Sequence, residues 1–529
     1  MKHREITVAG VSDFKDGEMK QVAADGTSIL LARVDGKYHA VGAICPHYGG
    51  PLAEGALCGN RVICPWHHAS FDVTTGDLLE PPAFDALPCY EVRIEGESVI
   101  VALPDEAIDR RTPPMARRDV QQDNRTFVIL GGGAAGYMAA QTLREERFQG
   151  RILMITREDR PPYDRPNLSK DYLQGHAEPE WIPLRPDEFF TDHDIEVMRG
   201  KEVARVDAQA KTITFKGGEQ LAYDALLVAT GGEPRTLPIA GSELKNVLLL
   251  RSFADSDAII AAAEASKRAV VIGASFIGME AAASLKTRGL EVTVVAPEKT
   301  PFEKTLGGEI GAVFQKIHQN NGVQFRLGAK VARITGHDKV AAVELESGEK
   351  LDADLVVVGV GVRPATGFLA GVSLHKDGGV MVDEHLRAAD GLYAAGDIAW
   401  CPSALTGERQ RIEHWRTAQQ QGRIAARNML GRNIAYSSVP FFWTRQFDAG
   451  LVYVGHATSW DEIIFQGDVS AQNFLAFYVK DGRVLAVAGM NHDREVAAIE
   501  GLMRLESLPS PDQLRSGSVN ILALLHSKC

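Results

Sequence analysis

The stretch TFVILGGGAAG, residues 126–136, decides the fold of this 529-residue chain. A run of β-forming residues ends at Gly131, and the residues that follow read as a helix through Arg144. In such a strand, turn and helix unit, Gly131 and Gly133 let the backbone approach a pyrophosphate, and Gly136 lets the helix pack on the strand. The pattern predicts a dinucleotide cradle, although a glycine-rich turn with a purely structural role reads the same way.

A second copy of this cradle, VVIGASFIGME, occupies residues 270–280. Gly273, Ser275 and Gly278 stand at the fingerprint spacing, after an apolar strand and before an alanine-rich helix. Ser275 replaces the middle glycine, which is acceptable if the backbone still turns away from the phosphates. Two cradles in one chain predict that the protein binds two dinucleotides.

The composition describes a globular protein of roughly three or four domains, with 45% hydrophobic and 24% charged residues. A net charge of −12 argues against a general nucleic-acid binder. The start MKHREITVAG has no apolar signal core, and no long apolar run follows, so we expect a cytoplasmic protein without a membrane partner. Six scattered cysteines do not indicate a disulfide framework.

Short alternating segments over residues 6–103 predict a small antiparallel β domain with two chemically distinctive loops. One loop carries Cys45 and His47, and the other carries Cys64 and His67. Two thiolates and two imidazoles suit a 2Fe-2S cluster in which the cysteines bind one iron and the histidines bind the other. A structural zinc held by the same four residues is the alternative.

Together with Gly49, Pro51 and Pro65, these loops resemble those of the Rieske family. Respiratory Rieske proteins brace the two loops with a disulfide, whereas the corresponding positions here are Gly50 and Trp66. We therefore expect a ferredoxin-type Rieske domain without that brace.

The positions that supply hydroxyl donors to the cluster sulfurs in respiratory members are Ala69 and Phe71 in this chain. Fewer hydrogen bonds to the reduced cluster lower its potential, so we expect a value toward the roughly −150 mV end of the Rieske range. His68 and Cys58 are expected to be packing or supporting residues and not ligands.

The segment after the β domain, residues 105–125, is charged, contains two adjacent prolines and has no apolar period. It reads as an exposed linker that tethers the cluster domain to the body. After the first cradle, a strand is predicted over 151–156, and Glu158 beyond it can accept ribose hydroxyls. A further buried strand ends at Thr230.

From residue 126 to about 430 the motifs resemble the pyridine nucleotide-disulfide reductase superfamily, in which a nicotinamide domain is inserted within a flavin domain. The loop PYDRPNLSK, residues 162–170, and the second cradle narrow this to the ferredoxin-reductase and apoptosis-inducing-factor branch. With its first domain, the chain is similar to Rieske-containing apoptosis-inducing-factor-like proteins. The implied multidomain fold combines an all-β Rieske domain, two Rossmann-like α/β domains for FAD and NAD, and a C-terminal α/β domain that covers the flavin and can dimerise. The implied boundaries are 1–104 (Rieske), 105–125 (linker), 126–246 and 371–436 (FAD), 247–370 (NAD) and 437–529 (C-terminal).

The resemblance also implies site residues. It pairs Lys170 with Glu280 beside the isoalloxazine as the catalytic pair, where a fixed positive charge favours reduced flavin; a surface lysine is the alternative. For His414 the alternative is a packed core histidine. The implied FAD-binding residues are Gly131, Gly133, Gly136, Glu158, Arg165, Lys170, Thr230, Asp397 on the ribityl chain, Glu413, His414 and Trp415 at the start of a helix, and Trp443.

The nicotinamide nucleotide is expected at Gly273, Ser275, Gly278 and Glu298. Because an acid near the ribose repels a 2′-phosphate, Glu298 favours NADH over NADPH, while Lys299 beside it leaves NADPH open.

No cysteine lies between residues 153 and 400, so electrons cannot leave the flavin through a dithiol. We therefore predict an NADH-dependent oxidoreductase that passes electrons through FAD to the fused cluster and on to an unidentified one-electron acceptor, with supply of an oxygenase as one option. The alternative is an NADH-responsive redox sensor, resembling apoptosis-inducing factor, with slow turnover.

Overall fold

The computed structural model describes residues 3–529, and its N-terminal β domain contains two antiparallel sheets. The larger sheet has the order β1-β10-β9-β4-β3-β2, and the smaller has the order β5-β6-β7-β8. The first motif loop connects β4 to β5, and the second connects β6 to β7. The bounds are β1 (His3–Gly10), β2 (Met19–Ala24), β3 (Thr27–Val34), β4 (Lys37–Gly42), β5 (Ala56–Cys58), β6 (Arg61–Ile63), β7 (Ser70–Asp72), β8 (Leu78–Glu80), β9 (Cys89–Glu95) and β10 (Ser98–Pro104).

The first dinucleotide sheet has the order β13-β12-β11-β17-β31-β30, parallel except for β30. Its strands are β11 (Thr126–Leu130), β12 (Arg151–Ile155), β13 (Ile195–Met198), β17 (Ala225–Val228), β30 (Arg387–Ala389) and β31 (Leu392–Ala394). Two helices, α1 (Ala134–Glu145) and α8 (Trp415–Met429), pack closely against each other. A Cβ on Gly422 of α8 would lie 2.2 Å from the carbonyl oxygen of Ala135, so glycine is needed at this contact.

The second dinucleotide sheet is entirely parallel, in the order β19-β26-β20-β21-β22. It is inserted in the chain between β17 and β31 of the first sheet, the arrangement that the family resemblance implies. Its elements are β19 (Val247–Leu249), α4 (Phe253–Glu264), β20 (Arg268–Ile272), α5 (Phe276–Thr287), β21 (Glu291–Ala296), α7 (Gly308–Asn320), β22 (Gln324–Leu327) and β26 (Leu355–Val358).

The C-terminal domain is a five-stranded antiparallel sheet, in the order β34-β35-β38-β37-β36, followed by three helices. A hairpin turn at Asp481-Gly482 joins β37 to β38. The bounds are β34 (Phe441–Gln446), β35 (Ala449–Gly455), β36 (Glu462–Asp468), β37 (Asn473–Lys480), β38 (Arg483–Met490), α9 (Asp493–Arg504), α10 (Pro511–Arg515) and α11 (Ile521–Lys528).

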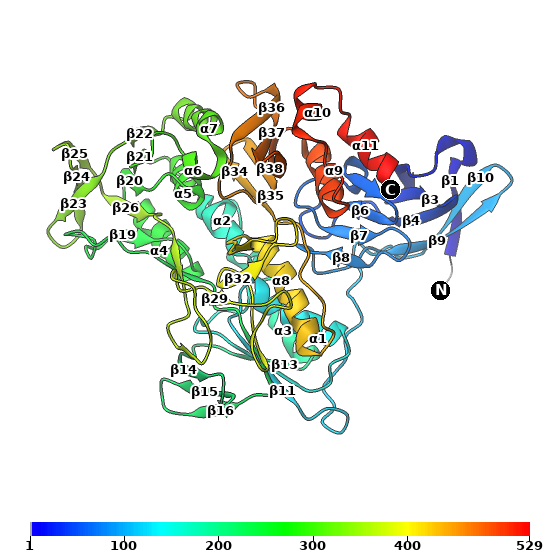
Figure 1. The fold of residues 1–529 in the computed structure, drawn as a ribbon, viewed down its shortest axis with the longest axis horizontal. Helices are drawn as coiled ribbons and strands as arrows, with labels where there is room; N and C mark the ends of the chain where they lie inside the picture. The colour runs from blue at the N-terminus through cyan, green and yellow to red at the C-terminus, as the bar shows by residue number, and fades with distance from the viewer. Residues whose placement is uncertain (1–2) are drawn as a thin grey trace.

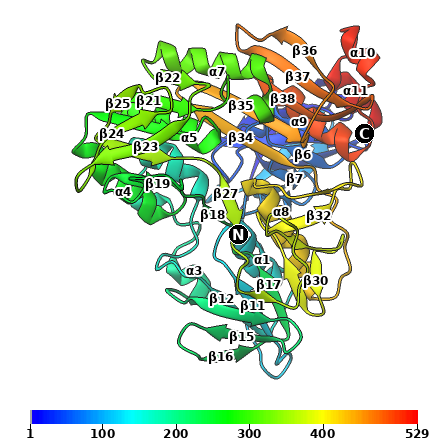
Figure 2. The ribbon, with the colours of Figure 1, turned by 60° about the vertical axis from the view of Figure 1, so that its left-hand side comes forward.

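This C-terminal sheet lies between two other domains. Tyr453 and Tyr478 on one face pack into the core of the second dinucleotide domain. Phe477 and Leu502, on the other side, share a core with Ile63 of the N-terminal domain. Figure 1 shows the result: the N-terminal domain (blue) lies beside α9 and α11 (red), and the second dinucleotide domain (green) lies at the opposite side. Figure 2, viewed from another side, also shows the N-terminal domain next to α9.

A disulfide joins Cys58 at the end of β5 to Cys529, the last residue. Cys58 was expected to be a packing or supporting residue and not a ligand, and its disulfide bond was not predicted. The two cysteines are 471 positions apart in the sequence and neither stands in a motif, so nothing local signalled the pair. The bond ties the C-terminal domain to the N-terminal domain.

The segment 105–125 has no helix or strand and lies along the body of the molecule. The backbones of Ala86 and Arg111 pair with each other, and the amide of Asp119 donates to the carbonyl of Gln149. The cluster domain is therefore held by packing as well as by its linker.

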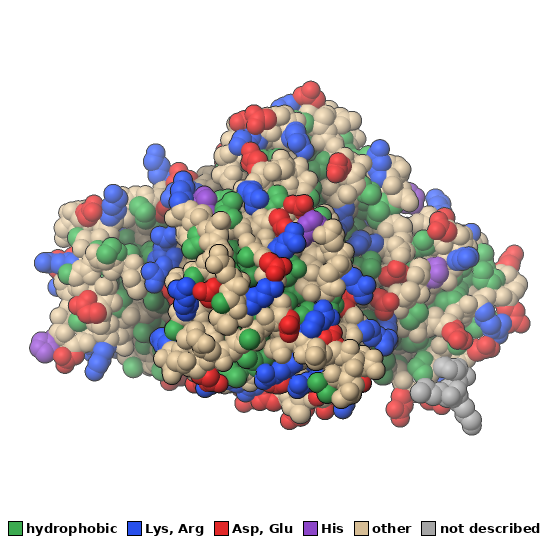
Figure 3. Space-filling view, turned by 60° about the horizontal axis from the view of Figure 1, so that its bottom comes forward, with side chains coloured by type: hydrophobic (Ala, Val, Ile, Leu, Met, Phe, Trp, Pro, Cys, Tyr) green, Lys and Arg blue, Asp and Glu red, His purple; other side chains and the backbone are tan. Residues whose placement is uncertain are grey.

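Smaller elements complete the fold. They are α2 (Asp171–Gln174), α3 (Asp187–Asp192), β14 (Val203–Asp207), β15 (Thr212–Phe215), β16 (Gln220–Ala222), β18 (Gly232–Pro234), α6 (Glu303–Leu306), β23 (Val331–Gly336), β24 (Val340–Leu345), β25 (Lys350–Asp352), β27 (Val362–Pro364), β28 (Leu369–Ala370), β29 (Val380–Met381), β32 (Ala399–Pro402) and β33 (Arg409–Gln410). Within residues 3–529, no helix has both the length and the apolarity needed to cross a membrane. Lys and Arg side chains are interspersed with Asp and Glu on the face shown in Figure 3.

Candidate redox site

The first cradle has the geometry that a pyrophosphate needs. Gly131 has φ +111°, and an added Cβ would lie 2.2 Å from the carbonyl oxygen of Ala229, so only glycine fits. A Cβ on Gly136 would lie 1.9 Å from the carbonyl oxygen of Gly131. Gly133 is the N-cap residue just before α1, and the atom nearest to its added Cβ is Nε of Arg165, 3.8 Å away. The first turn of α1 has no acidic residue and no side-chain cap, so its N–H groups are available to an anion.

The second cradle repeats this geometry at the start of α5. Gly273 has φ +113°, and its added Cβ would lie 2.3 Å from the carbonyl oxygen of Gly359. A Cβ on Gly278 would lie 2.2 Å from the carbonyl oxygen of Gly273. The Ser275 hydroxyl donates to the carbonyl of Gly359 over 3.3 Å, and the side chain does not cap the helix. The serine therefore leaves the helix start open, and the residues present suit a second dinucleotide.

A cavity of about 1610 Å³ extends from the first cradle to Phe276 and Ile277 at the start of α5. Sites for one small ligand usually measure about 300 to 1,000 Å³, so this cleft has room for a larger molecule such as a dinucleotide. Gly273, Ser275, Gly278 and Glu298 lie outside the lining of this cavity, near the C-terminal ends of β20 and β21. That edge of a parallel sheet is where nucleotides bind.

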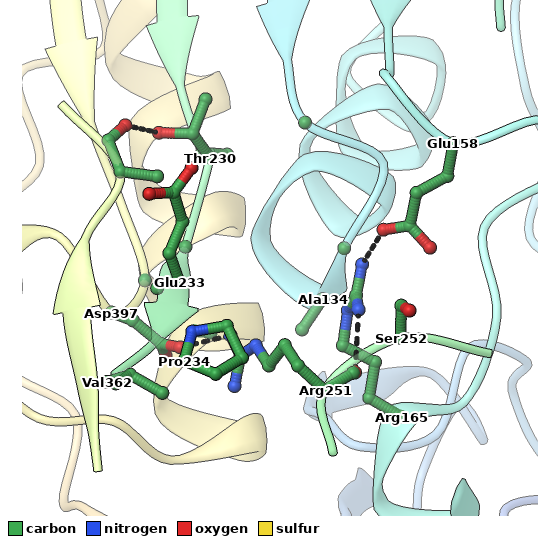
Figure 4. A pocket seen from close by; sticks show the side chains of 18 of the residues that line it. Ala134, Glu158, Arg165, Thr230, Glu233, Pro234, Arg251, Ser252, Val362 and Asp397 are labelled. Atoms are coloured by element: carbon green, nitrogen blue, oxygen red, sulfur yellow. Dashed lines mark hydrogen bonds and ion pairs between the residues drawn. The ribbon is translucent and has the colours of Figure 1, made fainter. Parts of the chain in front are cut away.

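Two arginines span the cleft between its acids, as Figure 4 shows. Arg165 donates to Oε1 of Glu158 over 2.5 Å and to the carbonyl of Arg251 over 3.1 Å. Arg251 donates to Oδ2 of Asp397 over 2.6 Å. Burial opposes ionisation of Glu158, but the charge of Arg165 and hydrogen bonds outweigh it and lower the pKa of Glu158. Two cations near the start of α1 complement a pyrophosphate.

Arg251 was missed from the sequence, because it follows the short strand β19 outside any motif. Thr230, a predicted site residue, lines the cleft, and its hydroxyl donates to the carbonyl of Ala365 over 2.7 Å.

Lys170 and Glu280 form the expected ion pair inside the cleft. Nζ of Lys170 lies 2.8 Å from Oε2 of Glu280, and their side chains are only 15% and 4% exposed. The hydroxyl of Ser169 also donates to Oε2, over 2.5 Å, and that of Thr444 donates to Oε1 over 2.7 Å. The carboxylate is thus fully engaged and holds the ammonium in a fixed position.

Glu413, His414, Trp415 and Trp443 all line the same cleft. The helix α8 begins at Trp415 and not at Glu413, so the expected helix start was two residues early. The His414 ring packs against Phe442, with centroids 4.6 Å apart, and burial lowers the pKa of His414 to about 3. His414 is therefore a neutral residue that both lines the cleft and packs.

The four predicted iron ligands lie on the two loops as one pair of histidines and one pair of cysteines. Nδ1 of His47 lies 3.1 Å from Nδ1 of His67, and burial lowers the pKa of His47 to about 3, so its imidazole is neutral and able to bind metal. A hydrogen bond between the Cys45 and Cys64 thiols raises the pKa of Cys45 and lowers that of Cys64. Among residues 3–529, no three His, Cys, Asp or Glu side chains converge on one point. Two separate pairs suit a two-iron cluster, whereas tetrahedral zinc needs all four ligands on one ion.

Contacts around the two loops support the positions of the four predicted ligands. A Cβ on Gly50 would lie 2.8 Å from Sγ of Cys64, so glycine leaves room beside the thiol. The amide of Cys64 donates to the carbonyl of Ala69 over 2.9 Å. His68 is fully buried and lies 2.6 Å, Nδ1 to Oε2, from Glu500 of α9, in the supporting role expected for it.

Trp443 joins the two halves of the site. Its ring centroid lies 4.5 Å from that of His67 and 6.3 Å from that of His47, while the same side chain lines the large cleft. Tyr48, beside His47, hydrogen-bonds to Asp164 in the loop that carries Arg165. The histidine side of the cluster loops therefore faces the cleft.

This combination defines a flavin- and pyridine-nucleotide-dependent oxidoreductase with a fused 2Fe-2S domain. The chain belongs to the pyridine nucleotide-disulphide oxidoreductase family, whose model matches residues 125–422. Residues 4–91 match the Rieske [2Fe-2S] domain, and residues 441–525 match the reductase C-terminal domain. The expected family, fold and cofactors are thereby confirmed.

Known proteins resemble most of the chain. Apoptosis-inducing factor 3 from Homo sapiens is 39% identical over 535 residues, covering 99% of this chain and 87% of that protein. Rhodocoxin reductase from Rhodococcus erythropolis is 35% identical over 390 residues, covering 73% of this chain and 91% of that protein. The solved covalent putidaredoxin reductase-putidaredoxin complex matches with a TM-score of 0.72 and 31% identity, covering 77% of this chain and 99% of that one.

Proposed function

We propose that the protein oxidises NADH and delivers the electrons singly, through its own cluster domain, to a separate one-electron acceptor. FAD held in the cleft supplies the conversion between two-electron hydride chemistry and one-electron transfer. The chain itself contributes the fixed Lys170 and Glu280 pair, the phosphate-binding cradles and the placement of the cluster loops.

The observation that carries this proposal is the position of Trp443. One aromatic side chain lines the flavin cleft and packs on His67, a predicted iron ligand, with 4.5 Å between ring centroids. An electron can therefore pass from cleft to cluster through packed side chains without a domain movement. The relatives named reductases support the same direction of electron flow.

A dithiol route is disfavoured. The free cysteines in residues 3–529 are Cys45, Cys64, Cys89 and Cys401, and none of them lines the cleft. The nucleotide is NADH in this proposal, because Glu298 places a carboxylate beside the C-terminal end of β21. The proposal also includes a cytoplasmic location and, as one option, an oxygenase that finally receives the electrons.

An anaerobic titration of the full chain with NADH tests the proposal. Flavin absorbance reports the first step, and the electron paramagnetic resonance signal of the reduced cluster reports the second. We expect both to change within the same titration. Flavin reduction without any cluster signal, even after long incubation, would rule out the internal relay.

The second candidate is an NADH-responsive binding protein that turns over slowly, and the 39% identity to apoptosis-inducing factor 3 favours it. In that case NADH binding would change the oligomeric state, for example by forming a homodimer. Sedimentation with and without NADH, combined with the rate of flavin reoxidation, separates the two candidates: a sensor shows a mass change and slow reoxidation, and an electron carrier shows rapid turnover.

A further inference from the structure

The two cluster loops carry an exposed apolar patch. Ten large apolar side chains stand out as exposed in residues 3–529, and three of them, Ile44 (41%), Tyr48 (45%) and Trp66 (41%), lie on or beside these loops. Trp66 ring atoms lie 3.3 Å from the position of a Cβ on Gly50, and Ile44 pairs with Pro51. We call Ile44, Tyr48 and Trp66 the loop patch.

Within the loop patch, the Tyr48 hydroxyl contacts Asp164 of the flavin domain, and the exposed side chains of Ile44 and Trp66 beside it offer a route to the cluster. The histidine rings face inward, because His67 packs on Trp443 of the cleft. Trp66 lies directly between Pro65 and His67 in the sequence, and the Tyr48 ring is 5.6 Å from the His67 ring. An acceptor seated on the loop patch would therefore be close to the cluster without displacing Trp443.

The surroundings of the loop patch are acidic. Glu54 is exposed just after the first loop, and Asp493 and Glu495 lie at the start of α9. The side chain of Arg494 donates to the carbonyl of Gly55, so Glu54 lies near the start of α9, which carries Asp493 and Glu495. Arg494 itself is an exposed cation among these carboxylates.

We propose that the loop patch and its acidic rim are the docking site for the final electron acceptor, a carrier protein with a ring of lysines around an exposed cofactor edge. A small apolar contact surrounded by opposite charges is the form that transient electron-transfer encounters take. The acidic rim steers a basic partner, and the loop patch seats its cofactor beside the cluster. This proposal specifies the partner class within the proposed function and rests on it for the source of electrons.

Stopped-flow mixing with a basic c-type cytochrome tests the site. The full holoprotein is reduced with stoichiometric dithionite and desalted anaerobically, so the test does not depend on NADH or on the internal relay. We expect the second-order rate constant to fall at least about tenfold between about 0.01 M and about 1 M ionic strength, where the screening length shortens from about 30 Å to about 3 Å. Cytochrome whose lysines are succinylated should react slowly and lose this salt dependence.

Two double variants separate the apolar and charged parts. The Ile44→Gln/Trp66→Gln variant should lower the rate constant about tenfold at every salt concentration, and the Glu54→Gln/Asp493→Asn variant should lower it mainly at low salt. Matched controls are Trp181→Gln, at a 70% exposed tryptophan elsewhere, and Asp338→Asn/Glu384→Gln, which removes the same charge from distant exposed sites. Neither control should change the rate constant by more than about twofold.

The resonance signal of the reduced cluster in each variant shows whether the loops remain intact, and the charge variant tests the proposal if the apolar variant loses its cluster. Equal rates in wild-type protein and both double variants, or equal rates with native and succinylated cytochrome, would overturn the proposal. A wild-type dimer that Ile44→Gln/Trp66→Gln dissociates would instead make the loop patch a contact between two copies. Failure of NADH to reduce the cluster would count against the proposed function alone.

Discussion

Nη2 of Arg416 lies 2.9 Å from Oε1 of Glu500, and both side chains are completely buried. The same guanidinium donates to the carbonyls of His68 and Pro81, each over 2.8 Å, so it joins α8, α9 and the cluster domain. Because a buried charge that loses its partner is strongly unfavourable, Glu500→Ala should lower the free energy of unfolding by about 3–5 kcal/mol. Urea denaturation followed by circular dichroism measures this.

Two further variants serve as controls for that measurement. Glu344→Ala removes an ion pair with the exposed Arg333 and should have little effect. Replacing both buried charges, as Arg416→Met/Glu500→Leu, should cost less than Glu500→Ala alone, since no charge is then left unpaired. If the double variant is the less stable of the two, the uncompensated charge is not the cause.

Lys170→Met should make the bound flavin harder to reduce. The variant removes a positive charge that Glu280 and the carbonyl of Pro166 hold in the cleft, and that charge favours the more negative reduced flavin. We expect a lower flavin midpoint potential and an NADH-dependent reduction about tenfold slower, which corresponds to about 1.4 kcal/mol in the barrier. Potentiometric titration and stopped-flow absorbance measure the two quantities, and an unchanged potential would contradict the assignment.

Trp443→Leu should slow cluster reduction relative to flavin reduction by about tenfold or more, because a gap replaces the aromatic contact with His67. Trp443→Phe should restore part of the rate. Trp415→Leu, which changes another tryptophan of the same cleft, serves as the matched control. Rapid-freeze resonance spectroscopy after mixing with NADH gives the ratio of the two steps; equal ratios in all variants would remove Trp443 from the route.

Glu298→Gln should raise the ratio of kcat/KM for NADPH to that for NADH. The carboxylate now binds Nζ of Lys304 over 2.8 Å, so the variant removes a negative charge and leaves that lysine free for a 2′-phosphate. We expect a change of about five- to tenfold, which steady-state kinetics with both nucleotides will show. Glu346→Gln, at a distant exposed acid, should leave the ratio unchanged.

Stability should fall as the pH drops from 7 toward 5. Burial lowers the pKa of His318 and His456 to about 4, so both are neutral in the folded protein. The unfolded chain, with ordinary histidine values near 6.5, binds more protons across this interval, so acid favours unfolding. Urea midpoints at several pH values measure the slope, and His318→Gln should make it shallower. A midpoint that does not decline toward pH 5 would contradict these low pKa values.

Local chemistry made much of this molecule predictable. Gly131 and Gly273 each occupy a backbone conformation and a close approach that only glycine tolerates, so their spacing reveals both cradles. The pairing of Lys170 with Glu280 was predicted from the family resemblance, which brings the loop at residues 162–170 together with the second cradle.

The remaining contacts join segments that are far apart in the chain. The His67 ring packs on Trp443. Arg416 forms an ion pair with Glu500, and Cys58 forms a disulfide with Cys529. None of these residues belongs to a periodic pattern in the sequence. The residues on either side of them give no sign of the contact. Such pairs arise from how whole domains dock, which no local pattern encodes.

The shared core between Ile63, Phe477 and Leu502 bears on how the molecule can be divided. A protein expressed from residues 105–529 alone would have an exposed apolar surface where β5 and β6 normally pack. Its Cys529 would be an unpaired thiol. The first hundred residues are therefore not an independent module, because they cover one side of a shared core, and removing them would expose the other side to solvent.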